Sequence, residues 1–137
     1  MPIEWNSDLS IGVLEVDVQH KILFEKFNTF VDAYQADKDQ EEVLRMFWFL
    51  EAYAITHFKD EEKLMQEVDF PDFLRHREKH KSFADELLKL KERLTAEGPS
   101  QKVFSKMATF ISGWLLGHIT VTDRAIGDFI NNERAQL

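Results

Sequence analysis

The sequence predicts an all-α fold: an up-down-up-down antiparallel four-helix bundle with an N-terminal extended arm and a short C-terminal helix. Three observations support this fold class. Apolar residues recur at steps of three and four along four long segments, which is the period of an amphipathic helix, and strand-like alternation is not sustained anywhere. The connections between these segments are short, so consecutive helices are expected to be antiparallel neighbours. At 137 residues, 44% of them apolar, the chain is expected to form one domain over residues 1–137.

The N-terminal half is expected to contain the arm and two helices. Residues 1–16 carry no clear helical period and are expected to be extended. Asp17 is a good N-cap residue, so the first helix is expected to begin there and to run to about Ala36. The second helix is expected to begin near Asp39, another good N-cap residue, and to end near Glu67.

The C-terminal half is divided by residues that break helices. The Asp69-Phe70-Pro71 segment interrupts the chain, and because proline is tolerated in a first turn, the third helix is expected to start there and to continue to about Ala96. Gly98-Pro99 ends this helix, and Ser100 is the expected N-cap of the fourth. Helix-weakening residues around His118 predict a break there, followed by the short C-terminal helix.

Composition and charge exclude several classes of protein. The net charge is −8 and the acidic and basic residues are interspersed, so nucleic-acid binding is not expected. The chain has no cysteine, which excludes disulfides, iron–sulfur ligation and thiol catalysis. The first residues do not resemble a signal peptide, and no apolar run is long enough to span a membrane, so we expect a cytoplasmic protein without membrane insertion.

The five histidines of the chain all lie on the core-facing stripes of the expected helices. A single histidine on such a face is more often a hydrogen-bonded core residue than a metal ligand. Here the histidines come from all four helices, and a glutamate shares the stripe of one of them. A buried carboxylate carries a large desolvation cost unless a cation or strong donors meet it. The sequence therefore predicts a buried metal site that draws on His20, His57, Glu61, His76, His80 and His118.

Spacing within the helices indicates how these side chains converge. His57 and Glu61 are four residues apart, as are His76 and His80, so each pair lies on one helix face about one turn apart. The carboxylates on either side of Glu61 point about 100° away from it on an ideal helix. They are weaker ligand candidates and are expected to face solvent.

The order and spacing of these residues resemble the metal-ligand set of the hemerythrin family, and the resemblance covers essentially the whole chain. Trp5, the Ile11-Gly12-Val13 segment and Asp17-x-Gln19-His20 resemble the bacterial branch of that family. The ligand motif reads His20, then His57-Phe58-x-x-Glu61, then His76-x-x-x-His80, then His118-Ile119-x-x-x-Asp123. By this resemblance the metal ligands are His20, His57, Glu61, His76, His80, His118 and Asp123.

Asp123 is a ligand by resemblance, although its spacing from His118 is unusual. Five steps of an ideal helix rotate a side chain by about 140°, so the two residues could not face one metal from an unbroken α-helix. Gly117 and Thr120–Thr122 weaken the helix here, and a bulge or a helix end would bring Asp123 back towards the site. From the residues alone, N-cap of the final helix is an equally good role for Asp123.

The resemblance implies two iron ions with an oxo or hydroxo bridge as the cofactor, and molecular oxygen as the ligand. Five imidazoles and two carboxylates are too many for one tetrahedral zinc but suit two octahedral ions. If both carboxylates and the solvent-derived bridge are shared, one terminal position stays open. By resemblance, His76, His80 and His118 complete the closed iron, and His20 and His57 bind the iron with the open position.

Phe58, Trp114, Leu115 and Ile119 flank ligands and resemble the apolar walls of the family's oxygen site, although plain core packing explains them equally well. The expected function is reversible oxygen binding, as a carrier for storage or local delivery and not as an enzyme. One alternative is an oxygen or redox sensor that acts through a protein partner, whose identity the sequence does not give. Another is a di-iron oxygen-activating oxidase or peroxidase. Ferritin-like enzymes of that second kind use Glu-x-x-His pairs, and this sequence has none.

Overall fold

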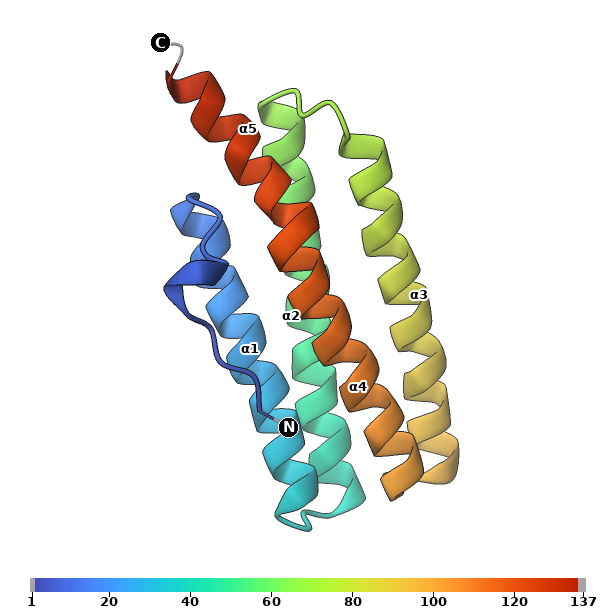
Figure 1. Cartoon of the computed structure of the whole chain (residues 1–137). Coiled ribbons are helices and arrows are strands. Elements are labelled where there is room, and N and C mark those ends of the chain that lie inside the picture. The colour runs from blue at the N-terminus through green and yellow to red at the C-terminus, as the bar shows by residue number, and fades with distance from the viewer. Residues whose placement is uncertain (1, 136–137) are drawn as a thin grey trace.

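The chain folds into a bundle of long helices that run alternately up and down (Figure 1). The computed structural model describes residues 2–135. The helices are α1 (Leu14–Gln35), α2 (Gln40–Glu67), α3 (Phe73–Glu97), α4 (Gln101–Gly117) and α5 (Arg124–Ala135). Contacts of α1 with α2, α2 with α3, α3 with α4, and α4 with α1 close the bundle. The all-α four-helix bundle expected from the sequence is confirmed.

The N-terminal arm is extended apart from a short 3-10 turn at Ser7–Leu9. The expectation that Asp17 caps the first helix is wrong, because α1 already begins at Leu14. The Asp17 carboxylate instead accepts hydrogen bonds from the Ser10 hydroxyl at 2.5 Å and from the Ile11 backbone N–H at 2.9 Å. Asp17 therefore fastens the arm to the first turn of α1, where a negative charge also suits the helix dipole.

The expected caps of α2 and α4 are confirmed. The Asp39 side chain accepts a hydrogen bond from the backbone N–H of Glu42 at 2.9 Å. Ser100 does the same for the backbone N–H of Val103 at 3.2 Å. Each cap satisfies one of the N–H groups that a helix start leaves without a partner.

The third helix starts later than expected. The α3 helix begins at Phe73, two residues after Pro71, because the chain turns first and Asp69 adopts a positive φ of 55°. Its other end is as expected: Gly98, with a φ of 80°, ends α3 in a conformation that favours glycine.

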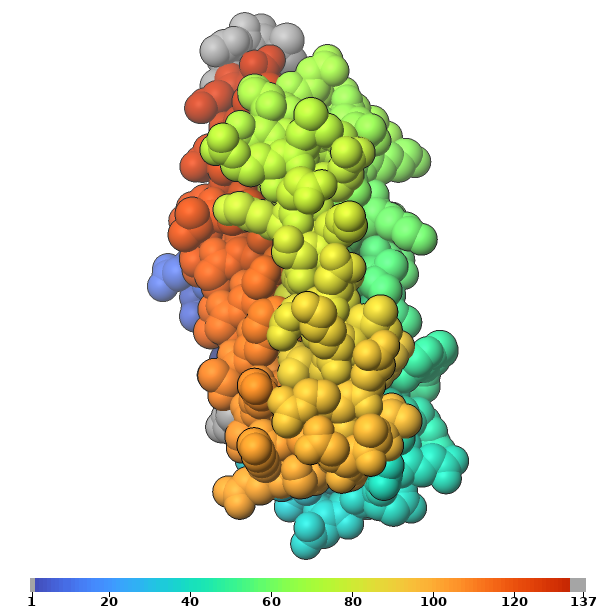
Figure 2. All heavy atoms as spheres, turned by 90° about the vertical axis from the view of Figure 1, so that its right-hand side faces the viewer, coloured from blue at the N-terminus to red at the C-terminus, as the bar shows by residue number. Residues whose placement is uncertain are grey.

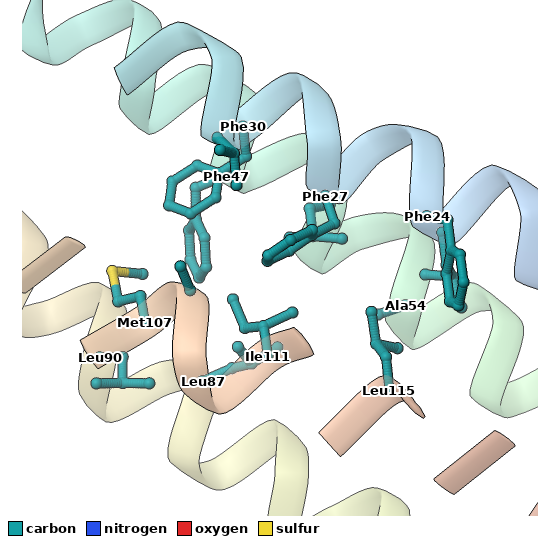
Figure 3. Packing of buried hydrophobic residues seen from close by; sticks show 14 of the residues in the cluster. Phe24, Phe27, Phe30, Phe47, Ala54, Leu87, Leu90, Met107, Ile111 and Leu115 are labelled. Atoms are coloured by element: carbon teal, nitrogen blue, oxygen red, sulfur yellow. The ribbon is translucent and has the colours of Figure 1, made fainter. Parts of the chain in front are cut away.

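Phenylalanine and leucine are the most frequent residues in the larger of two apolar clusters in the bundle. Figure 3 shows Phe27 of α1 pointing towards Ile111 of α4, Phe24 near Leu115 farther along α4, and Phe30 beside Phe47 of α2. Phe27 and Phe30 are fully buried, and burial of one such side chain stabilises the fold by about 1.5–3 kcal/mol.

The smaller cluster joins the arm and α5 to the ends of α1 and α2. Its buried members are Ile11, Val13, Val16, Met65, Phe70, Ile126 and Ile130. Along α1 and α2 the two clusters follow one another, and His20 of α1 and Glu61 of α2 lie between them in the sequence.

Figure 2 shows α3 at the surface, with α4 and α5 along one side and α2 along the other. Arg75, Arg77 and Lys79 of α3 are exposed, whereas His76 and His80 are buried. The helix is therefore amphipathic, and its buried stripe carries the two histidines. Within residues 2–135, no helix has the length and apolar character needed to cross a membrane.

Candidate metal centre

Seven buried side chains from α1, α2, α3 and the α4–α5 junction converge between the two apolar clusters. None is more than 6% exposed. Their potential ligand atoms form two groups, in each of which the atoms lie within 4.8 Å of one another. The first group is Glu61, His76, His80, His118 and Asp123, and the second is His20, His57, Glu61 and Asp123. The structure thus brings together all seven residues that the sequence singled out, and both groups contain the two carboxylates.

A wide helical turn brings Asp123 to the site. Residues His118–Asp123 form a π-helical turn that continues α4 directly into α5. The expected opening of the turn is observed, but the helix does not break. Asp123 is not an N-cap, because it lies within the π-helical turn itself. In a π turn the backbone bonds at i→i+5, so residues five apart come to share a face. The Thr120 hydroxyl donates to the backbone carbonyl of Leu116, in the last turn of α4, at 2.8 Å.

The five imidazoles all direct Nε2 towards the centre of the site. The Nε2 atom of His118 lies 3.1 Å from that of His76 and 3.2 Å from that of His80. Two neighbouring ligands on an octahedral ion with bonds of about 2.1 Å lie about 3 Å apart. Both distances from the His118 nitrogen therefore match those between neighbouring ligands of one octahedral ion.

Glu61 divides its two oxygens between the histidine groups. Its Oε1 lies 2.7 Å from Nε2 of His76 and 3.0 Å from that of His80. Its Oε2 lies 3.2 Å from Nε2 of His57 and 3.9 Å from that of His20. Each oxygen thus faces one group of imidazoles.

Asp123 divides its oxygens in the same way. Its Oδ1 lies 2.8 Å from Nε2 of His118 and 3.0 Å from that of His76, whereas its Oδ2 lies 2.9 Å from Nε2 of His20. A carboxylate with one oxygen towards each of two donor groups has the arrangement of a bridging ligand.

Two carboxylate oxygens in the site lack a hydrogen-bond partner. These are Oε2 of Glu61 and Oδ1 of Asp123, both in side chains that are at most 1% exposed. A buried acceptor without a donor costs about 1–3 kcal/mol, and more when it is charged. The short distances from Asp123 Oδ1 to two imidazole nitrogens do not relieve this cost, because neither contact has hydrogen-bond geometry. The donor set fits a bound cation, which both oxygens could ligate.

Burial and charge act in opposite directions on the pKa values of the site. Burial raises the pKa of Glu61, but hydrogen bonds from the surrounding imidazoles outweigh it and hold that pKa well below its usual value. Burial and the Glu61 charge raise the pKa of Asp123, while His118 and His20 lower it to about 2. Burial lowers the pKa of His76, but its contacts with the two carboxylates raise it to about 9. Both carboxylates are therefore ionised at neutral pH, and their charge suits a cation.

Two polar side chains that the sequence did not single out for a role at the site contact the outer nitrogens of its histidines. The Oε1 atom of Gln19 lies 2.6 Å from Nδ1 of His57, and the Gln19 amide donates to Asp60 at 2.9 Å. Glu62 Oε2 lies 2.9 Å from Nδ1 of His80. Partners of this kind fix the ring orientation of a metal-binding histidine and raise its basicity. Asp60 is exposed as expected, but the expectation that Glu62 faces solvent holds only in part, because its side chain is 24% exposed.

Two of the four apolar residues singled out by the sequence stack on histidines of the site. The ring of Phe58 stacks on His80 with centroids 4.1 Å apart, and Trp114 stacks on His118 at the same separation. Leu115 and Ile119 are buried in the larger apolar cluster. Phe58 and Trp114 therefore contribute to the apolar surroundings of the site.

A four-helix bundle that gathers five imidazoles and two carboxylates at its centre belongs to the class of bundle proteins with an internal metal site. Residues 12–130 match the model of the hemerythrin HHE cation binding domain. Because this match covers most of the chain, the protein belongs to the hemerythrin family.

Known proteins with similar sequences and structures span nearly the same length. A bacteriohemerythrin from Stenotrophomonas maltophilia is 28% identical over 124 residues, which cover 90% of this chain and 78% of that protein. A hemerythrin-like protein from Naegleria gruberi is 32% identical over 122 residues, which cover 89% of this chain and 88% of that protein. The crystal structure of a wild-type hemerythrin superposes with a TM-score of 0.82 at 26% identity, and covers 93% of this chain and 97% of that one.

Proposed function

We propose that this chain binds molecular oxygen reversibly at a non-haem di-iron centre, as an oxygen carrier for storage or local delivery. The observation that carries this proposal is the division of both carboxylates between two histidine groups. One metal ion would not need two such groups. Membership of the hemerythrin family and the similarity to bacteriohemerythrins favour iron as the metal.

Each side chain has a role in this proposal. Glu61 and Asp123 would bridge the two ions. His76, His80 and His118 would complete the coordination of one ion, and the second group, His20 and His57, would leave one position open on the other. When bound, two ferrous ions supply the two electrons that reversible oxygen binding requires.

The protein around the site would keep water out and hold the ligands in place. The apolar clusters above and below the centre exclude solvent, and Phe58, Trp114, Leu115 and Ile119 would form the apolar walls of the oxygen pocket. Gln19 and Glu62 would hold the rings of His57 and His80 through Nδ1. A dry, apolar site of this kind limits the loss of protons and electrons to solvent.

The nitrogen-rich donor set favours oxygen binding over substrate oxidation. Five imidazoles and two carboxylates surround the centre, whereas ferritin-like di-iron enzymes are rich in carboxylates. We therefore propose that the protein is not an enzyme.

The test is the visible spectrum of the reduced, iron-loaded protein under argon as air is admitted, purged and admitted again. Reversible oxygen binding requires a charge-transfer band that appears with air, fades on purging and returns. A one-way change to a ferric spectrum would favour a sensor or an oxygen-activating enzyme. A protein without any iron-dependent band would contradict the di-iron proposal.

A further inference from the structure

Three surface grooves reach residues of the candidate metal centre from different sides. A groove of about 460 Å³ between α1 and α2 reaches Glu61. A groove of about 220 Å³ between α2 and α3 reaches His80. A third, of about 180 Å³, lies between α3 and the π turn and reaches His76. A metal ion bound in so deeply buried a site has to pass through one side of the bundle.

The charge around the α1–α2 groove distinguishes it from the other two. Its rim carries the exposed carboxylates of Glu15, Asp60 and Glu67 against the single ammonium group of Lys63. The carboxylate of Glu61 lies at its floor. The groove therefore has a clear excess of negative charge.

In the other two grooves, cationic side chains outnumber carboxylates. Lys59, Arg77 and Lys81 line the α2–α3 groove, against one carboxylate. Arg75 and Lys79 line the groove beside the π turn, again against one carboxylate. A hydrated divalent cation is repelled at both of these openings and attracted at the first.

The floor of the α1–α2 groove offers a free ligand atom. Glu61 is 1% exposed and lines this groove, and its Oε2 has no hydrogen-bond partner. This observation is independent of the rim charges, since it concerns a buried oxygen that no protein donor satisfies. A cation that enters by the rim would meet this oxygen as its first buried ligand.

Gln19 lies in the same groove and links its rim to the site. Its amide donates to the rim carboxylate of Asp60, and its oxygen contacts Nδ1 of His57. His57 is four residues before Glu61 and faces the same unpartnered oxygen at 3.2 Å. The groove therefore leads to the second histidine group, the one with fewer imidazoles.

We propose that this acid-rimmed groove, defined by Glu15, Asp60, Glu67 and the floor residue Glu61, is the route by which divalent iron enters the bundle. The proposal rests on the proposed function, because iron is the cargo. The rim carboxylates raise the local concentration of the hydrated cation, and Oε2 of Glu61 replaces one of its waters. Low-dielectric walls around a charged cleft strengthen such steering.

The test is the rate of ferrous iron uptake by the metal-free full-length chain under argon, followed by quenching with a chelator and measurement of protein-bound iron. The rim variant carries Glu15→Gln and Glu67→Gln. The matched control carries Glu78→Gln and Glu92→Gln, which remove two exposed carboxylates of α3 that do not line the groove. Uptake is measured at low and at high ionic strength.

We expect the rim variant to load roughly fivefold or more slowly than the control at low ionic strength, with the difference shrinking in high salt. Both variants should reach the iron content of the unmodified protein. Lys63→Glu, which adds negative charge to the rim, should load faster. Equal loading rates for rim variant and control at low ionic strength would overturn the route while leaving the di-iron proposal intact. Failure of the unmodified chain to bind two ions would overturn both.

Discussion

At the scale of single residues, Glu61 and Asp123 each offer a ligand atom to both histidine groups. A substitution at either position therefore removes a ligand from both groups. We expect Glu61→Gln to reduce bound iron from two ions per chain to one or none, because a neutral amide offers one oxygen where two are needed and cannot balance the charge. The measurement is iron content per chain after loading and desalting.

The matched control is Glu62→Gln, the same substitution one residue later. Glu62 contacts only the outer nitrogen of His80 in the site, and an amide oxygen can replace that contact. This variant should keep two ions. Retention of two ions by Glu61→Gln as well would contradict the bridging role.

Leu115 is the residue that tests the apolar wall. We expect Leu115→Ala to accelerate autoxidation of the iron-loaded protein severalfold, because the cavity it leaves would admit water beside the centre. The variant should also lose about 2–5 kcal/mol of stability. Leu87→Ala is the control, since this equally buried leucine lies two turns along α3 from His80. It should lose similar stability at an unchanged autoxidation rate, and equal rates in both variants would remove Leu115 from the wall.

Sequence alone identifies those site residues whose burial has a large desolvation free energy. Five histidines and Glu61 on apolar stripes indicate a cation because few other arrangements satisfy them. Gln19 and Glu62 give no such signal, since a polar residue beside a core stripe is ordinary on an amphipathic helix. Their contacts with His57 and His80 depend on how α1, α2 and α3 are placed in space, and the sequence does not state that placement.

At the scale of elements, local chemistry predicts some boundaries and misses others. The caps at Asp39 and Ser100 depend only on residues within the next turn, and both were predicted. Asp17 was misassigned because a carboxylate that could cap a helix accepts N–H and O–H donors from the arm just as well. For the weak helix around His118, the residues predicted a bulge or a helix end without deciding between them, and the structure has a π turn that runs on into α5.

The contact between α5 and the arm can be tested with glycine substitutions. A Cβ atom on Gly127 would lie 1.8 Å from the carbonyl oxygen of Ile11, so Gly127→Ala has to push the arm away from α5. We expect a loss on the order of 2 kcal/mol, measured by urea unfolding. Gly113→Ala is the control, because nothing lies within 4 Å of its Cβ position and alanine favours the helix by about 1 kcal/mol. A Gly127→Ala variant as stable as Gly113→Ala would contradict this contact.

At the scale of the whole molecule, the metal centre separates two apolar clusters that each stabilise the bundle. The larger cluster holds together the four helices α1, α2, α3 and α4. The smaller one joins the arm and α5 to α1 and α2. Helical periodicity predicted the apolar stripe of each of the four helices, but not the division of the core into two clusters. It also did not predict that the buried histidines and carboxylates would lie at one height along the bundle, because that height depends on how the four helices are aligned with one another.

Removal of the metal should therefore lower the stability of the folded bundle as well as abolish oxygen binding. In the metal-free chain, two buried carboxylates keep oxygens without hydrogen-bond partners, whereas bound cations would satisfy them. A ligand at a thousandfold excess over its Kd stabilises the folded state by about 4 kcal/mol. For a chain of this size, about 3 °C per kcal/mol predicts a Tm at least roughly 10 °C lower without iron. Differential scanning calorimetry of loaded and chelator-treated protein measures this difference. Equal Tm values would mean that the imidazoles and carboxylates satisfy one another without a cation, and the unpartnered oxygens would then no longer support a metal at the centre.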